Sequence, residues 1–221
     1  STRQQTSACQ QIAETMNEVR DVAHQVAQSS LETERTVIDI TGLAETLRHI
    51  VEEEIQEKGK KLAREGALAM SQILEQALAN GHLTRSQLFD TNYMEIPDTL
   101  PPKYHTAYDA YTDQNIQKPL DNYLASDDQI FFAVLVDSNG YLPTHNSCFS
   151  KPLTGDQEKD KTGNRTKRIF NDPVGLAAAK NLEPVLVQVY NRDTGEKMWD
   201  VSAPVYLDGE HWGAFRVGYS M

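Results

Sequence analysis

The sequence predicts an α+β protein: a long N-terminal coiled-coil helix, then a domain with a five-stranded antiparallel sheet flanked by helices. Small and apolar residues recur every three or four positions from Cys9 to Val51, which is the spacing of a helix that packs along its length. Runs rich in β-branched and aromatic residues occupy 130–145 and 185–219, separated by turn residues. We expect residues 1–57 to form the helical segment and residues 58–221 the sheet-containing domain.

The N-terminal segment has neither Gly nor Pro before Gly42, so nothing in it ends a helix. At about 1.5 Å per residue its seam would extend roughly 60 Å. Positions beside the seam are also small or apolar, a wide stripe that suits a four-helix bundle; an ordinary two-stranded coiled coil is the alternative. Both arrangements predict a homodimer through this helix. The seam consists of Cys9, Ile12, Met16, Val19, Ala23, Val26, Ser30, Thr33, Val37, Ile40, Ala44, Leu47 and Val51.

Paired glutamines lie among small residues near the start of this helix, in the run Thr6-Ser7-Ala8-Cys9-Gln10-Gln11. This run, within residues 4–30, resembles the returning helix of the signalling domain of bacterial methyl-accepting chemotaxis proteins, the chemoreceptors. The resemblance implies chemotaxis signal transduction, with Gln10 and Gln11 as adaptation methylation sites. It also implies that a chemotaxis kinase and its adaptor bind the full-length receptor.

Charged residues occupy the seam after Val51, at 52–54 and 58–61, and we expect the joint between the two domains there. Gly59 lowers helix propensity by roughly 1 kcal/mol relative to Ala, which permits a bend. A second helix is expected from Leu62 to Leu78, ended by Asn80-Gly81. A short helix is expected after Asp172-Pro173, because Asp suits the N-cap and Pro the first helical position.

The five predicted strands fall into two groups. The first group is a buried strand at 130–136 and an edge strand at 141–145, joined by a turn that ends at Asn139-Gly140. The second group is three strands within 185–219, joined by turns at 192–195 and at Asp208-Gly209. Three adjacent antiparallel strands form a stable unit, which a single hairpin does not.

Side chains alternate between the two faces of a strand, so the last group predicts two different faces. One face combines apolar and polar groups, in Leu186, Gln188 and Tyr190 and in Met198, Asp200 and Ser202. The opposite face is almost wholly apolar, in Val185, Val187 and Val189 and in Trp199, Val201 and Ala203. We expect the apolar face to pack against a helix and the mixed face to line a small-molecule pocket.

The candidate ligand-binding residues are Tyr190, Asp200, Gln188 and Ser202, together with His145 from the predicted edge strand and Arg168 from the loop that follows it. Arg168, with Arg165, would clamp a carboxylate through paired hydrogen bonds. A ligand that carries both an acid and an amine would then meet Arg168 and Asp200 together. The alternative is a structural pair between Asp200 and Arg168, with Tyr190 as a core residue.

Several short segments between residues 62 and 219 resemble the PAS-like or Cache-like sensor domains of bacterial chemoreceptors. They are 140–146, 164–175, 200–206, 211–214 and 218–219. The resemblance implies that the domain binds a small polar ligand and couples it to a helical bundle. Some members of that family attach haem covalently at a CxxCH motif, whereas this chain has Cys148 alone. The second hypothesis is therefore a redox or gas sensor that holds haem non-covalently through His145 or His211.

The composition of the chain argues against several classes of function. The net charge of −11 and the pI of about 5.0 argue against a nucleic-acid partner, which needs a basic surface. The two cysteines form no CxxC motif, and we expect a cytoplasmic protein, whose full-length form could be membrane-anchored. Because no nucleophile–base pair or metal-ligand spacing stands out, we expect neither an enzyme, nor a metal site, nor a resident cofactor.

Overall fold

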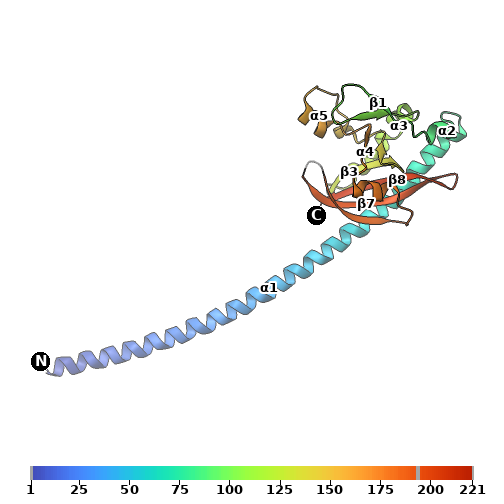
Figure 1. Ribbon diagram of the computed structural model, residues 1–221. Helices are drawn as coiled ribbons and strands as arrows, with labels where there is room; N and C mark the ends of the chain where they lie inside the picture. The colour runs from blue at the N-terminus through green and yellow to red at the C-terminus, as the bar shows by residue number, and fades with distance from the viewer. Residues whose placement is uncertain (1, 193–194, 221) are drawn as a thin grey trace. The chain divides into compact units, whose positions relative to one another are not determined.

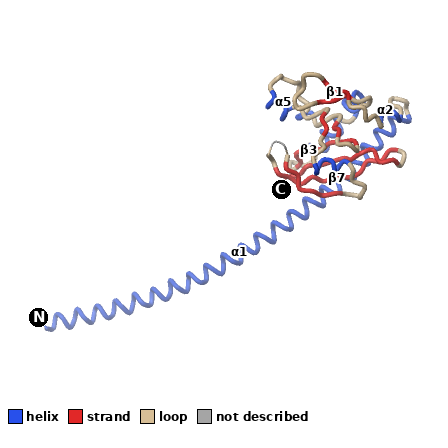
Figure 2. Tube along the Cα trace, in the orientation of Figure 1, coloured by secondary structure: helices blue, strands red, loops and turns tan. Residues whose placement is uncertain are grey.

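The computed structural model describes residues 2–192 and 195–220, apart from the side chain of Gln4. It confirms the predicted α+β class, because a long helix precedes antiparallel strands and further helices (Figure 1). The chain divides into two compact units, residues 1–51 and residues 52–221. All described strands belong to the second unit (Figure 2). None of the described helices has the length and apolar character that crossing a bilayer requires.

The long helix α1 (Thr2–Ala79) is continuous, so the expected interruption between two helices near 52–61 is wrong. The charged residues there lie on the exposed side of the helix, while a buried stripe begins at Ile55 and includes Gly59 and Ala63. Gly59 serves close packing rather than a bend: a Cβ on it would lie 3.0 Å from Val201 Cγ2 and 3.2 Å from the Tyr219 ring. Ile55 follows Val51 by four residues, about one helical turn, so the stripe continues along the helix and becomes buried from Ile55 onward.

The first unit consists of α1 residues up to Val51, and its apolar seam is uncovered in the single chain. Ile12, Met16 and Val26 are 63%, 65% and 63% exposed. Exposed apolar side chains at such regular spacing are typical of a helix that is covered by another helix. Gln10 and Gln11 are also exposed on this helix.

The main sheet has four strands among the described residues, in the order β3-β8-β7-β6, and every neighbouring pair is antiparallel. The prediction of five strands is therefore wrong by one strand. The strands of the main sheet are β3 (Ile130–Asp137), β6 (Leu186–Asn191), β7 (Lys197–Leu207) and β8 (Glu210–Ser220). The predicted turn at Asp193 and Thr194, between β6 and β7, lies outside the described residues.

The missing member, β4 (Tyr141–Leu142), pairs with β5 (Arg168–Ile169) instead of β3. The backbone groups after the turn at Gly140 are taken by the later segment. Phe170 N–H donates to Gly140 O at 2.8 Å, and Lys167 N–H donates to Leu142 O at 2.7 Å. These hydrogen bonds join the segment to β5, and the described pairings of β3 are with β8 alone.

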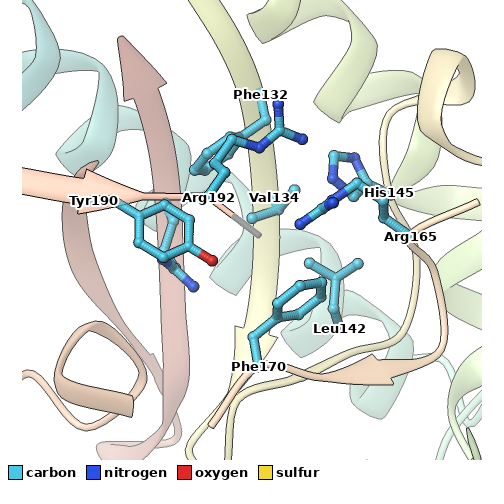
Figure 3. A pocket seen from close by; sticks show the side chains of 9 residues that line it. Phe132, Val134, Leu142, His145, Arg165, Phe170, Tyr190 and Arg192 are labelled. Carbon is cyan, nitrogen blue, oxygen red and sulfur yellow. The ribbon is translucent and has the colours of Figure 1, made fainter. Parts of the chain in front are cut away.

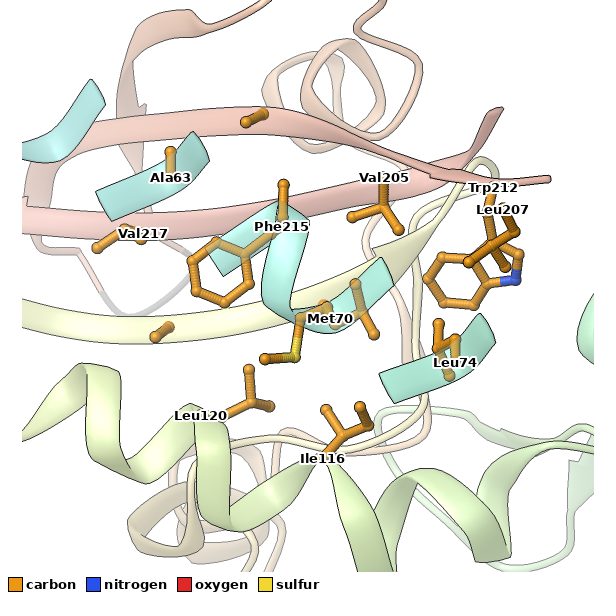
Figure 4. Packing of buried hydrophobic residues seen from close by; sticks show 14 of the residues in the cluster. Ala63, Met70, Leu74, Ile116, Leu120, Val205, Leu207, Trp212, Phe215 and Val217 are labelled. Carbon is orange, nitrogen blue, oxygen red and sulfur yellow. The ribbon is translucent and has the colours of Figure 1, made fainter. Parts of the chain in front are cut away.

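One face of the sheet packs against α1, as the strand alternation predicted (Figure 4). Ala63, Met70 and Leu74 of α1 lie in one apolar cluster with Val201 of β7 and Phe215 of β8. Helix α4 (Gln117–Leu124) contributes to the same cluster. Gly66 permits the close approach, because a Cβ on it would overlap the ring of Phe215.

The other face is covered by α6 (Pro173–Ala179) and by the segment that contains β4 and β5. Asp172 caps α6 by accepting hydrogen bonds from the N–H groups of Val174 and Gly175, and Pro173 stands at its first position. This confirms the predicted short helix. The sheet thus lies between two different layers.

The remaining elements connect these layers. They are α2 (Arg85–Leu88), β1 (Met94–Ile96), β2 (Lys103–His105), α3 (Asp109–Asn115), a 3₁₀ turn at Ser147–Phe149 and α5 (Gln157–Gly163). Strands β1 and β2 form a separate antiparallel pair.

Candidate functional site

A small cavity lies on the sheet face opposite α1, between the strands and the loops around β4 and β5 (Figure 3). We call it the basic hollow. Its free volume is about 20 Å³. A water molecule needs roughly 10–15 Å³ on this measure, so the basic hollow in this structure has room for one or two water molecules. A ligand of several atoms would require its lining side chains to move apart. It is lined by Phe132, Val134, Leu142, His145, Arg165, Phe170, Tyr190, Arg192 and Arg216.

The strand register brings part of this lining together. Val134 of β3 is the cross-strand partner of Arg216 of β8, so their side chains share a face. Phe132 stands beside Gly218, and a Cβ on Gly218 would overlap the Phe132 ring. The glycine therefore makes room for an aromatic wall of the basic hollow.

Arg216 of β8 lines the basic hollow and forms an ion pair with the buried carboxylate of Asp200. Its Nε and Nη2 donate to the two carboxylate oxygens of Asp200 at 3.2 and 3.1 Å. Arg216 is 3% exposed and Asp200 is fully buried. Burial alone would lower the pKa of Arg216, but the Asp200 carboxylate outweighs it and raises that pKa. The guanidinium therefore keeps its charge inside the fold.

Two further arginines enter from loops. Arg165 follows α5, its backbone N–H donates to Phe149 O at 2.8 Å, and its guanidinium lies over the Phe170 ring at 5.3 Å. Arg192 follows β6, lies over the Phe149 ring at 5.3 Å and has Glu196 at 3.9 Å. Figure 3 shows Arg165 and Arg192 on opposite sides of Val134. Aromatic contacts hold both guanidinium planes in place.

His145 is a neutral donor in this site. The backbone N–H of Asn146 donates to Nδ1 of His145 at 2.8 Å, which leaves the ring proton on Nε2. Burial, followed by the charges of Arg165 and Arg192, holds the pKa of His145 well below its usual value. The guanidinium groups of Arg165 and Arg192 therefore oppose a second proton on the ring.

The lining has the chemistry that an anionic ligand requires. Three guanidinium groups, an imidazole and a phenol line the basic hollow, and no Asp or Glu is among the described residues that line it. Guanidinium groups recognise carboxylates and phosphates through paired hydrogen bonds, and such bonds strengthen where water is excluded. No group of three His, Cys, Asp or Glu among the described residues could hold a metal ion.

The structure places two of the predicted site residues, Tyr190 and His145, in the lining of the basic hollow. Gln188 and Asp200 share the predicted face as cross-strand partners. However, Gln188 Nε2 donates to Val174 O at 3.2 Å and so holds α6. Ser202 is fully buried as the cross-strand partner of Arg216, outside the lining.

The predicted meeting of Arg168 and Asp200 does not occur. Arg168 lies outside the lining, donates from Nη1 to Lys161 O at 3.4 Å and stacks on Phe170 at 4.8 Å. The carboxylate of Asp200 is occupied by Arg216, so an amine on a ligand would find it already paired. Of the two arginines expected to clamp a carboxylate, the structure brings Arg165 to the basic hollow.

Two lining arginines were missed in the sequence. Arg216 is the one charged residue in the otherwise apolar run 212–217, and a buried charge needs an oppositely charged partner. That signal was present. The sequence places Arg192 in the predicted turn at 192–195, and nothing in its local sequence indicates that its side chain reaches the sheet face.

Haem does not fit these residues. The N–H of Asn146 donates to Nδ1 of His145, which leaves the ring proton on Nε2, the nitrogen that would have to bind iron, and a free volume of about 20 Å³ has no room for a porphyrin. The other candidate ligand, His211, lies on β8 against the Tyr206 ring at 5.5 Å, outside the lining of the basic hollow.

Comparisons with known proteins give little beyond this geometry. No family model and no curated protein match the chain. The crystal structure of the Escherichia coli DcuS sensor domain is similar at a TM-score of 0.36 and 16% identity, over 72% of this chain and 91% of that chain.

An extracellular ligand-binding receptor from Desulfohalobium retbaense is similar at a TM-score of 0.36 and 12% identity, over 74% of this chain and 25% of that chain. Both neighbours are thus described as sensing or ligand-binding proteins. Scores this low do not assign the chain to a family, and the α+β class rests on the chain's own elements.

Proposed function

We propose that the chain is a signal-transduction module that binds a small carboxylate or similar anion in the basic hollow and passes the signal to α1. The observation that carries the proposal is the convergence of Arg165, Arg192 and Arg216 around a cavity beside a neutral His145. Asp200 is the counter-ion of Arg216, and Arg165 and Arg192 bring two further guanidinium groups to the same lining, so an anionic occupant would find several donors there.

Strand β8 offers a route for the signal, because it contacts both layers. Arg216 faces the basic hollow, while its neighbour Phe215 faces α1 at Gly66. An anion that draws Arg216 toward the loops would shift Phe215 against a helix with no free space at that point. A ligand changes such an equilibrium only by binding one arrangement better than the other.

The exposed seam of α1 supports a homodimer as the receiving element. Because the N-terminal helix resembles a chemoreceptor signalling helix, we propose chemotaxis as the pathway. A chemotaxis kinase and its adaptor would then be the partners of the full-length receptor, and Gln10 and Gln11 would be its methylation sites. The cytoplasmic location also stays a prediction. Val26→Pro should break the helix at the seam, at a cost of about 3 kcal/mol or more, and yield monomers in light scattering.

Gln28→Ala, at an exposed position outside the seam, is the control for that measurement and should leave the dimer intact. A wild-type protein that is monomeric at micromolar concentration would contradict the dimer without affecting the ligand site.

A thermal-shift screen tests the ligand class. Acetate, propionate, alanine and phosphate should raise the melting temperature, whereas ethylamine should not, because ligand bound only by the folded state adds stability. Arg165→Gln should reduce the shift, and Arg64→Gln, which removes the same charge from an exposed position on α1, should not. Stabilisation by ethylamine alone would refute an anion site.

A further inference from the structure

Lys103 of β2 is a buried lysine directed at the loop that carries Arg165. It is 3% exposed, and its Nζ donates to Asn164 O at 3.0 Å, to Asn164 Oδ1 at 2.8 Å and to Thr166 O at 2.6 Å. The two carbonyls belong to the residues immediately before and after Arg165. All three protons of one ammonium are therefore directed at the backbone and side chain that flank this arginine.

The same loop is tied to β2 a second time. The N–H of Tyr104 donates to Lys167 O at 2.7 Å, and Lys167 itself has a positive φ of 61°. A non-glycine residue in that conformation persists where its surroundings hold it. The segment 164–167 is thus fixed by β2 on one side and delivers Arg165 to the basic hollow on the other.

We propose that Lys103 is a positioning residue for the anion site: its ammonium clamps the carbonyls on either side of Arg165 and so fixes the guanidinium in the basic hollow. This inference rests on the proposed anion-binding function, because Lys103 does not line the cavity itself. It adds a residue from β2, which forms part of a separate hairpin, to the machinery of the site.

The charge of this clamp depends on pH. Burial, followed by the charge of Arg168, lowers the pKa of Lys103 to about 8; Asp160 opposes this shift, while Lys167 and Arg165 add to it. Above pH 8 the amine loses one of its three donors and its charge. We therefore expect anion affinity to fall as the pH rises through 8.

The stability of the fold should change in the opposite direction. The pKa of a lysine in an unfolded chain is about 10.4. Between pH 8 and pH 10 the unfolded state therefore binds more protons than the folded state. The contribution of Lys103 to the free energy of unfolding then rises with pH. A lysine that only stabilises the fold would leave the affinity of the folded protein unchanged between pH 8 and pH 10, whereas a positioning lysine makes affinity fall while stability rises.

Calorimetric titration of the full chain with acetate and propionate, at pH 7 and pH 9, tests the clamp, since neither probe changes charge in this range. Lys103→Met should weaken binding about tenfold at pH 7 and remove the pH dependence. Lys103→Arg keeps a charge that does not titrate here and should restore pH-independent binding. Lys151→Met, at an exposed residue whose N–H donates to Gly163 O at 3.0 Å, removes the same charge without a clamp and should bind normally.

Hydrogen exchange separates this inference from the proposed function, because it needs no anion. Amides of 164–168 should exchange faster in Lys103→Met than in the wild type, with the sheet amides unchanged. If the wild type binds neither probe but exchange responds, the clamp stands and the anion function fails for these carboxylates. Unchanged affinity and unchanged exchange in Lys103→Met would overturn the clamp itself.

Discussion

The two faces of the sheet are built differently although the same strands supply both. The face toward α1 is apolar and tightly packed, and glycines at 59 and 66 let the helix approach it. The opposite face contains a buried ion pair, a buried histidine and a cavity. Charges are costly to bury, so the Asp200–Arg216 pair makes this face the less cohesive of the two unless the pair is well satisfied.

Strand β8 shows the division within one element. Phe215 and Val217 belong to the apolar cluster, and Arg216 between them lines the basic hollow. Successive side chains of a strand point to opposite faces of the sheet, so a displacement of Arg216 would move the adjacent residue Phe215, which contacts α1. The comparison predicts that charge substitutions and packing substitutions affect different properties.

The largest expected effect comes from the charged face. Asp200→Asn leaves the buried guanidinium of Arg216 without its counter-ion and should lower the free energy of unfolding by about 3–5 kcal/mol. Urea denaturation measures this loss. The double variant Asp200→Leu/Arg216→Met should recover much of the stability but bind no anion. If Asp200→Asn is as stable as the wild type, the pair does not stabilise the fold.

A smaller loss is expected on the packed face. Gly66→Ala places a Cβ against the Phe215 ring, which overpacks the interface and should cost about 1–3 kcal/mol, against a gain of up to about 1 kcal/mol in helix propensity. Gly42→Ala, which meets nothing within 4 Å, should show the gain alone. Adding Phe215→Leu should relieve the Gly66→Ala defect.

Helicity and urea denaturation of the three glycine variants decide between these explanations. A Gly66→Ala protein that gains stability as Gly42→Ala does would show that the helix and the sheet are not in close contact at this position.

The smallest effect concerns His145. Its folded pKa lies well below the unfolded value because of burial and the neighbouring arginines, so the unfolded chain takes up a proton first as the pH falls below about 6.5. The stability contribution is complete above that pH and is lost below it, by at most about 1.4 kcal/mol per pH unit. His145→Gln should lose less stability than the wild type between pH 6.5 and 5.5, and equal slopes would contradict a neutral histidine.

The local sequence was sufficient for much of the fold. Heptad spacing predicted the long helix, strand alternation predicted which face meets α1, and Asp172-Pro173 predicted the start of α6. These features depend on the nearest few residues, which determine capping, propensity and which side of an element is apolar. Strand alternation also placed Tyr190 on the face that contains the basic hollow.

Only the tertiary structure shows which residues and strands pair with one another. Asp200 pairs with Arg216 and not Arg168, β4 pairs with β5 and not β3, and the charged stretch after Val51 stays within one helix. Each of these outcomes is a choice among groups far apart in the sequence. The alternation of a strand fixes the side on which a residue lies, whereas the register between strands and the path of the loops determine which residue it meets there.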